Sequence, residues 1–165
     1  MKLIHCADIH LDSPMQTHMT AQQASVRNTE MLQSFVRLTE FAQERAVRAV
    51  LIAGDLFDGA RVRARTVDAL LAAIRRTPEV DYLYLPGNHD EAANAFCDCA
   101  LPGNLKLFGK TWSTVQYDGI AISGVQIGAD AALYETLPHT DGAVNLVMLH
   151  GGIGTACGED MINLN

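Results

Sequence analysis

The chain has 165 residues, of which 48% are hydrophobic and 19% charged, and its formal net charge is −7. This length and composition predict one globular domain with a substantial core, and they exclude a disordered or fibrous chain. The acidic balance argues against a surface coated for nucleic acid, because phosphate binding depends on Lys and Arg. Carboxylates clustered around a metal would also make the chain acidic, so charge alone leaves a phosphate substrate open.

The sequence shows no sign of a membrane or secretion signal. No apolar run reaches the roughly 20 residues that a membrane helix requires, and His5 and Asp8 interrupt the first apolar run almost at once. The four cysteines form neither a disulfide framework nor a Cys-x-x-Cys pair, and we expect reduced thiols. These features predict a cytoplasmic protein that does not enter a membrane.

The first half of the chain alternates apolar runs with helical patterns. Each apolar run ends in a Gly, Pro or Asp that breaks it, and the run "AVLIAG" is typical of a strand buried on both faces. The helical patterns show apolar residues at spacings of three and four. The expected elements are a strand at 2–7, a helix at 20–45, a strand at 49–54, a helix at 67–74, a strand at 80–87 and a short helix at 91–100.

The second half reads as short strands punctuated by Gly and Asp, at 105–109, 112–126 and 143–150, with a hairpin turn at "YDG" (117–119). The order is therefore β-α-β-α-β followed by mostly β. This order predicts a single α/β domain with mixed sheets, because hairpins are joined to crossover units.

Polar residues follow four of the expected strands at their carboxyl ends. In open α/β sheets, ligands bind beyond these ends, so we expect the polar residues to meet at one edge. They are Asp8 and His10 after the first strand, Asp55 and Asp58 after the second, Asn88, His89 and Asp90 after the third, and His150 after the late strand.

This mixture of carboxylate, imidazole and amide oxygen suits divalent ions such as manganese, magnesium, zinc or iron, and the lack of thiolate argues against a structural zinc. A carboxylate can bridge two ions that clamp the attacking and leaving oxygens of a phosphoryl displacement. Asp55 is the expected bridge because it follows the central buried strand. Gly54 and Gly87 would let the backbone turn sharply beneath the metals.

The segments "HCADIHLDSP", "GDLFD" and "LPGNHD" together resemble the calcineurin-like metallophosphoesterases. They look most like the branch of DNA-repair exonucleases that includes the nuclease subunit of the SbcCD complex. The resemblance covers residues 2 to about 150, nearly all of the single domain at 1–165. It implies a four-layer α/β/β/α sandwich with two mixed sheets, a dimetal centre at one edge, and phosphodiester hydrolysis by a water that the two metals activate, with manganese the first choice.

The resemblance also implies a role for each matching residue. Two metal shells would share Asp55; their ligands would be Asp8, His10 and Asp55 for the first ion and Asp55, Asn88 and His150 for the second. His89 would stabilise the transition state or protonate the leaving oxygen, and Asp58 would hold the tautomer of His89. Asp90 is expected to fix its loop and to take no part in the chemistry.

One departure from the family pattern is expected to matter. Family members carry a further "GHxH" motif after the strand that ends in His150, and its two histidines complete the metal shells. The remaining histidines do not sit in such a motif: we expect His5 to be a hydrogen-bonded core residue, and His18 and His139 to lie in loops. The sequence thus reads as an N-terminal portion that lacks this motif and any cap domain. We expect it to bind manganese weakly in a calorimetric titration and to show little or no activity; tight binding of two ions would contradict this.

Three functions remain open from the sequence. The first is the catalytic core of a metal-dependent DNA exonuclease or endonuclease in DNA repair, which would work as a homodimer with a coiled-coil ATPase partner. The second is a phosphodiesterase or phosphatase for small phosphoesters. The third is a degenerate scaffold that binds proteins, although such scaffolds usually lose the catalytic histidine. The basic stretch "RVRAR" at 61–65 is interpreted as a solvated helix face.

Overall fold

The computed structural model describes residues 1–15, 19–58, 62–90, 96, 99–126, 131–153 and 161–162. Its elements, in chain order, are β1 (Leu3–Cys6), α1 (Ala21–Glu44), β2 (Ala49–Ala53), α2 (Ala64–Arg75), β3 (Asp81–Leu85), β4 (Leu105–Leu107), β5 (Ser113–Tyr117), β6 (Ile120–Gly124), the 3₁₀ helix η1 (Ala131–Tyr134), β7 (Val144–Met148), β8 (Gly152–Ile153) and β9 (Met161–Ile162).

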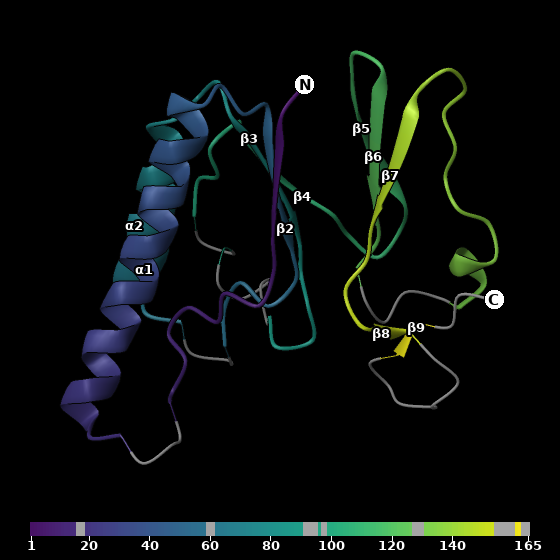
Figure 1. The fold of residues 1–165 in the computed structure, drawn as a ribbon. Coiled ribbons are helices and arrows are strands. Elements are labelled where there is room, and N and C mark those ends of the chain that lie inside the picture. Colours follow the sequence, from purple (N-terminus) through teal and green to yellow (C-terminus); the bar gives the residue numbers. More distant parts are fainter. Residues whose placement is uncertain are drawn as a thin grey trace.

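The first sheet has four strands in the order β1-β2-β3-β4, and every neighbouring pair is parallel. Helices α1 and α2 cover one of its faces (Figure 1). Every residue of β2 and of β3 is buried, as their continuous apolar sequences predict, because a second sheet covers the other face. With parallel strands, all carboxyl ends of this sheet lie along one edge.

Helix α1 begins where the sequence predicts, because Thr20 caps it. The Thr20 hydroxyl accepts from the Gln23 N–H, and the Gln23 side chain accepts from the Thr20 N–H, which completes a capping box. The buried residues of the helix lie in its C-terminal half, at Phe35, Thr39 and Ala42. The N-terminal half extends past the carboxyl edge of the sheet (Figure 1).

The second sheet has the order β5-β6-β7, with an antiparallel hairpin and one parallel pair. The hairpin turns at Gly119, which has a φ of 71° that favours glycine. The two sheets lie face to face (Figure 1). Residues such as Leu51 and Leu83 from the first sheet pack with Ile122 and Met148 from the second in a core separate from that under the helices.

At the edge opposite the carboxyl ends, Asp81 joins the two sheets. Its carboxylate accepts a hydrogen bond of 2.8 Å from the Tyr117 hydroxyl and pairs with Arg48 at 3.1 Å and Lys106 at 3.4 Å. The guanidinium of Arg48 lies over the Tyr117 ring. This cluster satisfies a buried carboxylate and connects β3 to β5 across the two layers.

The α/β fold with two sheets agrees with the expected sandwich. The second sheet is mixed as expected, whereas the first is parallel throughout its four described strands because each is joined to the next by a crossover. The helix expected at 91–100 lies almost wholly outside the described residues. Of the four layers, the described residues supply one layer of helices and the two larger sheets, and β8 and β9 form a further two-stranded parallel sheet.

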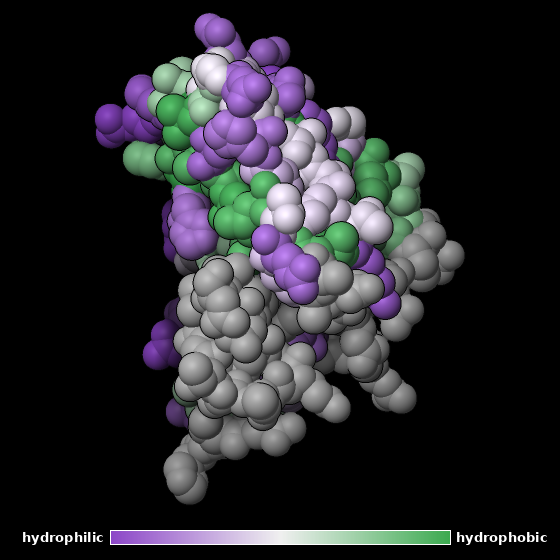
Figure 2. All heavy atoms as spheres, turned by 90° about the vertical axis from the view of Figure 1, so that its right-hand side faces the viewer, coloured by the Kyte–Doolittle hydropathy of each residue, from purple (hydrophilic) through white to green (hydrophobic). Residues whose placement is uncertain are grey.

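On the side of the molecule that carries the second sheet, hydrophobic and hydrophilic residues are mixed on the part of the surface that is coloured in Figure 2. On β7, Val144 is 60% exposed. None of the helices in the described part of the chain is long and apolar enough to cross a membrane. Cys6 and Cys99 are free thiols, as expected for reduced cysteines, and Cys97 and Cys157 lie outside the described residues.

Candidate metal centre

The loops that follow β1 and β2 run side by side, which brings their polar residues together. Backbone hydrogen bonds continue beyond the strands, from Asp8 N–H to the Gly54 carbonyl (3.1 Å) and from His10 N–H to the Asp55 carbonyl (2.9 Å). Leu11 then forms an isolated parallel bridge with Phe57. This extended pairing fixes Asp8 and His10 beside Asp55 at the carboxyl edge of the sheet.

The backbone of this edge is unusual, because non-glycine residues adopt left-handed conformations there. Asp8 has a φ of 53°, His10 of 50°, Asp12 of 63° and Asp55 of 50°. Each such residue costs of the order of 1 kcal/mol, and such strain gathers at functional sites. The turns place these side chains at the sheet edge instead of letting them follow the strand direction.

Asp55 is the centre of the polar cluster, with 6% of its side chain exposed. Its Oδ1 accepts from the His89 N–H at 3.1 Å and lies 3.5 Å from His150 Nε2. Its Oδ2 lies 3.8 Å from His10 Nε2. Potential ligand atoms of Asp8, Asp55 and His150 all lie within 4.8 Å of one another. The predicted residues therefore converge, and Asp55 is their common neighbour.

The surroundings of His150 indicate that this cluster suits a cation. His150 Nδ1 lies 3.0 Å from the Ala53 carbonyl, which can only accept, so Nδ1 carries a proton. Nε2 lies 3.1 Å from Asn88 Oδ1 and 3.5 Å from Asp55 Oδ1, and its role as donor or acceptor depends on the tautomer. An imidazole nitrogen, an amide oxygen and a carboxylate oxygen thus meet at one point, and this donor set fits a divalent metal.

Gly54 and Gly87 are needed because the site packs directly against their backbones. A Cβ on Gly54 would overlap the ring of His150, and its φ of 87° also favours glycine. A Cβ on Gly87 would overlap the Asp55 carboxylate and would lie 2.9 Å from His150 Cδ2. The expectation that these glycines serve the site agrees with this geometry, and close approach is the reason at both positions.

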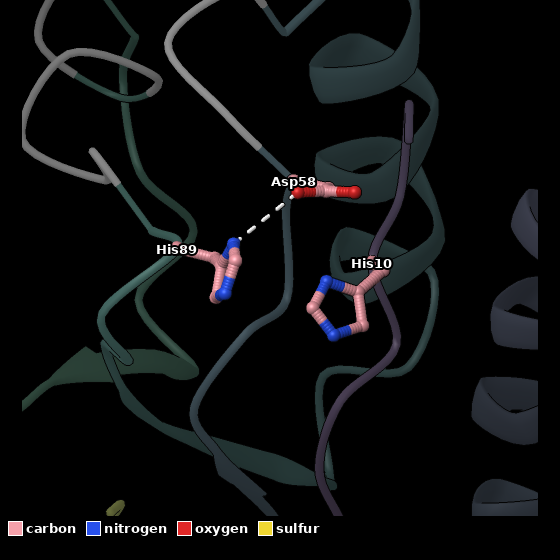
Figure 3. A group of neighbouring side chains, drawn as sticks. All are labelled: His10, Asp58 and His89. Carbon is pink, nitrogen blue, oxygen red and sulfur yellow. Dashed lines mark ion pairs between the residues drawn. The ribbon is translucent and has the colours of Figure 1, made fainter. Parts of the chain in front are cut away.

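A second group of potential ligands contains His10, Asp58 and His89 (Figure 3). His89 Nδ1 faces Asp58 Oδ1 at 3.4 Å, and the His10 and His89 rings meet edge to face at 5.4 Å. His89 keeps 51% of its side chain exposed, so its other nitrogen can reach a substrate. His10 thus lies between the two groups, and its buried Nδ1 has no partner among the described residues.

Asp90 holds the loops together, in agreement with the role expected for it. Its carboxylate accepts from the backbone N–H groups of Leu56 (3.1 Å), Phe57 (2.7 Å) and Gly87 (2.9 Å). Three backbone donors fully engage this buried carboxylate, so it ties the loop after β2 to the loop after β3. It is therefore structural and does not face the cluster as a ligand.

A cavity of about 520 Å³ opens beside Asp55 and is lined by Asp8, Asn88 and His150. His5 lines it as well and is exposed, so the expectation of a core residue was wrong. The reason is that β1 is the outer strand of the first sheet among the described strands. Burial raises the pKa of the Cys6 thiol to about 11, so this thiol stays protonated at neutral pH.

Sequence reasoning missed two contacts that support the site. The Ser13 hydroxyl donates to Asp58 Oδ2 at 2.6 Å. Asp12 accepts from the Arg63 backbone and guanidinium and from the Thr66 hydroxyl, so Arg63 is not simply solvated as expected. Partners more than 40 residues apart leave no signal in a single sequence.

Two histidines were expected to lie in loops. His139 is exposed beside Asp141, as expected, and His18 lies outside the described residues.

Two curated relatives share part of their sequence with this chain. The DNA double-strand break repair protein Mre11 of Methanopyrus kandleri is 30% identical over 95 residues, which is 54% of this chain and 19% of the relative. The uncharacterized metallophosphoesterase YhaO of Bacillus subtilis is 25% identical over 174 aligned positions, which cover 97% of this chain and 43% of the relative. The chain therefore spans less than half the length of either relative.

Among solved structures, the nuclease MPE of Pseudomonas putida aligns with a TM-score of 0.38 and 17% identity, over 92% of this chain and 62% of that one. A protein of unknown function from Aquifex aeolicus, AQ665, aligns with a TM-score of 0.34 and 11% identity, over 74% of this chain and 59% of that one. The profile of one protein family covers residues 1–164. The chain belongs to the calcineurin-like phosphoesterase family.

Proposed function

We propose that this chain carries the catalytic centre of a nuclease that hydrolyses DNA phosphodiester bonds in DNA repair. The centre would use two divalent cations, and manganese is the cation that we propose. The observation that carries the proposal is the convergence of acceptor atoms around Asp55 from four separate strand ends. An uncompensated cluster of acceptors is costly unless it binds a cation. Phosphoester hydrolysis is the activity by which the family of this chain is named, and we place a DNA phosphodiester in that substrate class.

We assign the ligands as the sequence predicts. Two ions would share Asp55; the first would also take Asp8 and His10, and the second Asn88 and His150. Bound divalent metals supply a water of lowered pKa and neutralise charge that develops on the phosphate. The carbonyl of Ala53 keeps His150 in the tautomer whose Nε2 faces the cluster.

The proton needed by the leaving oxygen is assigned to His89. The Asp58 carboxylate faces His89 Nδ1, which favours a proton on Nδ1 and directs Nε2 towards the open side of the site. The Asp58 carboxylate also stabilises the doubly protonated ring, in which Nε2 carries a second proton; that proton can be donated to the leaving oxygen or stabilise its charge. Asp58 contributes through His89 and does not contact the substrate.

The choice of DNA is supported by the relative named as a DNA double-strand break repair protein. The acidic balance of the chain is compatible with this substrate, because bound cations would attract the phosphates locally. A coiled-coil ATPase partner, a homodimer and a cytoplasmic location remain predictions from the sequence. An assembly with these properties would act on DNA ends as one unit.

The proposal is tested by metal binding and hydrolysis in the full-length gene product. We expect manganese to bind, and linear DNA to be degraded faster than a chromogenic phosphodiester. Asp55→Asn should lower the hydrolysis of linear DNA and of the chromogenic phosphodiester by at least about 100-fold, because it removes the ligand that the two ions would share. The matched control is Asp68→Asn, an exposed carboxylate on α2, which should change neither.

Each other outcome contradicts part of the proposal. Hydrolysis of the small phosphodiester without DNA cleavage would favour a small-molecule phosphodiesterase or phosphatase. Absence of metal binding and of hydrolysis would leave a protein-binding scaffold. Activity that survives in Asp55→Asn would place the chemistry elsewhere.

A further inference from the structure

We propose that Ser13 is a positioning residue that orients the Asp58 carboxylate towards His89. The inference rests on the proposed function, because His89 must act on the leaving oxygen for its orientation to affect hydrolysis. The Ser13 hydroxyl donates to Asp58 Oδ2 at 2.6 Å, whereas Asp58 Oδ1 faces His89 Nδ1 at 3.4 Å. The two carboxylate oxygens are thus divided between two partners.

The hydroxyl of Ser13 is itself committed to this arrangement. Its oxygen also accepts from the Met15 N–H at 3.4 Å, so the hydroxyl proton remains directed at Asp58. A carboxylate anchored at one oxygen cannot rotate freely about its last side-chain bond. Asp58 keeps 24% of its side chain exposed, so without Ser13 water would compete for the oxygen that faces His89.

The segment that carries Ser13 is held from both helices. The Asn28 amide of α1 donates to the Ser13 carbonyl at 2.9 Å. At the start of α2, the N-cap residue Arg63 and the helical residue Thr66 donate to the neighbouring Asp12 carboxylate, which has 3% of its side chain exposed. The position of the hydroxyl is therefore set by the packed helices, as expected for a residue that orients another side chain.

The turn also makes Ser13 a direct neighbour of His10, since the Ser13 N–H donates to the His10 carbonyl at 3.2 Å. One short left-handed turn thus delivers an imidazole to Asp55 and a hydroxyl to Asp58. This explains why the segment "DIHLDS" supplies more to the site than Asp8 and His10, the two residues that we predict as ligands.

The test compares Ser13→Thr with Ser13→Val, which have the same shape and differ in the hydroxyl, in the full-length gene product. Ser13→Val should lower kcat about tenfold with KM unchanged, since a hydrogen bond to a charged group is lost. The loss should be larger for a phosphodiester with a poor leaving group than for a nitrophenyl ester, because His89 acts on the leaving oxygen. Ser13→Thr should stay within about twofold of the wild type.

If Ser13 acts through Asp58, adding Ser13→Val to an Asp58→Asn variant should not lower kcat further. The exposed Ser34→Ala on α1 is the matched control and should leave kcat unchanged. Equal kcat for Ser13→Thr and Ser13→Val, or an equal loss on both substrates, would overturn the inference.

A second measurement does not depend on activity. Nitrogen-15 shifts of the His89 ring in the metal-free protein should report a mainly Nδ1-protonated tautomer, and Ser13→Val should reduce that population while Ser13→Thr preserves it. An unchanged tautomer in Ser13→Val would overturn the inference. If the wild type hydrolyses no phosphodiester but the tautomer changes as expected, the proposed function fails and the positioning contact stands.

Discussion

At the scale of single residues, the geometry of the site depends on two glycines that leave room for the polar side chains. Gly54 and Gly87 leave the space into which His150 and Asp55 pack. Their neighbour Asp90 engages three backbone donors and holds the same loops in register. The ligand arrangement is therefore fixed by close backbone packing around Asp55.

We predict that Gly87→Ala removes metal binding and destabilises the fold. The new Cβ would overlap Asp55 Oδ1, and the relaxation should cost about 1–3 kcal/mol in the free energy of unfolding. Gly109→Ala is the control, because its Cβ would meet nothing within 4 Å. Manganese calorimetry and thermal melting measure the two effects; wild-type manganese affinity in Gly87→Ala would contradict the prediction.

The polar residues that we propose as ligands could be picked out from the sequence because each follows an apolar run. For the residues after β1, β2 and β3, convergence follows from the rule that parallel strands end at one edge, whereas His150 reaches the cluster from β7 of the second sheet. Ser13 and Arg63 were not predictable as supporting residues, since their partners Asp58 and Asp12 lie 45 and 51 residues away. The exposure of His5 depended on strand order, which the apolar pattern of "KLIHCA" does not reveal.

At the scale of elements, the loop after β1 is joined to the first turn of α2 by Asp12. Burial alone would raise the pKa of Asp12, but the hydrogen bonds from Arg63 and Thr66 outweigh it and hold that pKa below its ordinary value. A carboxyl group with a depressed pKa stabilises the fold fully above its ordinary value near 4. That stabilisation is lost as the pH falls through the lower pKa of the folded state.

We therefore predict that Asp12→Asn lowers the free energy of unfolding by about 1–2 kcal/mol at pH 7. The difference from the wild type should stay constant down to about pH 4 and shrink at lower pH, because only the wild type takes up a proton there. Urea unfolding at a series of pH values measures it. Asp68→Asn, on the exposed side of α2, should show no difference at any pH; a gap that persists unchanged at pH 3 would exclude the Asp12 contact as its cause.

The helices and strands themselves followed local rules closely. The boundaries of α1 and β2 lie within a residue or so of those expected, because Thr20 caps the helix and Gly54 ends the strand. The parallel pairing of all four strands in the first sheet was harder to predict from the sequence. It depends on which strand each crossover connection places next to which. The periodicity of apolar residues therefore predicts where helices and strands lie in the sequence better than it predicts which strands pair.

At the scale of the whole molecule, the two sheets are joined at opposite edges by different chemistry. The carboxyl edge carries the polar cluster around Asp55, and the other edge carries Asp81 with its cations and Tyr117. Burial and the hydrogen bond to Asp81 raise the pKa of Tyr117, so its hydroxyl remains a donor. The two edges are separated by the length of β3, about 16 Å for five residues.

We predict that Tyr117→Phe lowers the free energy of unfolding by about 1 kcal/mol and leaves manganese affinity unchanged. The variant removes one hydrogen bond between the sheets and retains the ring under Arg48. Asp55→Asn should instead abolish manganese binding. Denaturation and calorimetry on both variants separate the edges; a loss of manganese affinity in Tyr117→Phe would show that they are coupled.

The left-handed turns at Asp8, His10, Asp12 and Asp55 have an evolutionary consequence. Replacing Asp8 by glycine would relieve backbone strain and remove a negative charge close to Asp55, so the altered chain would resist heat better while it lost a carboxylate that we propose as a ligand. Selection for thermal stability alone would therefore favour glycine over the proposed ligand at this position.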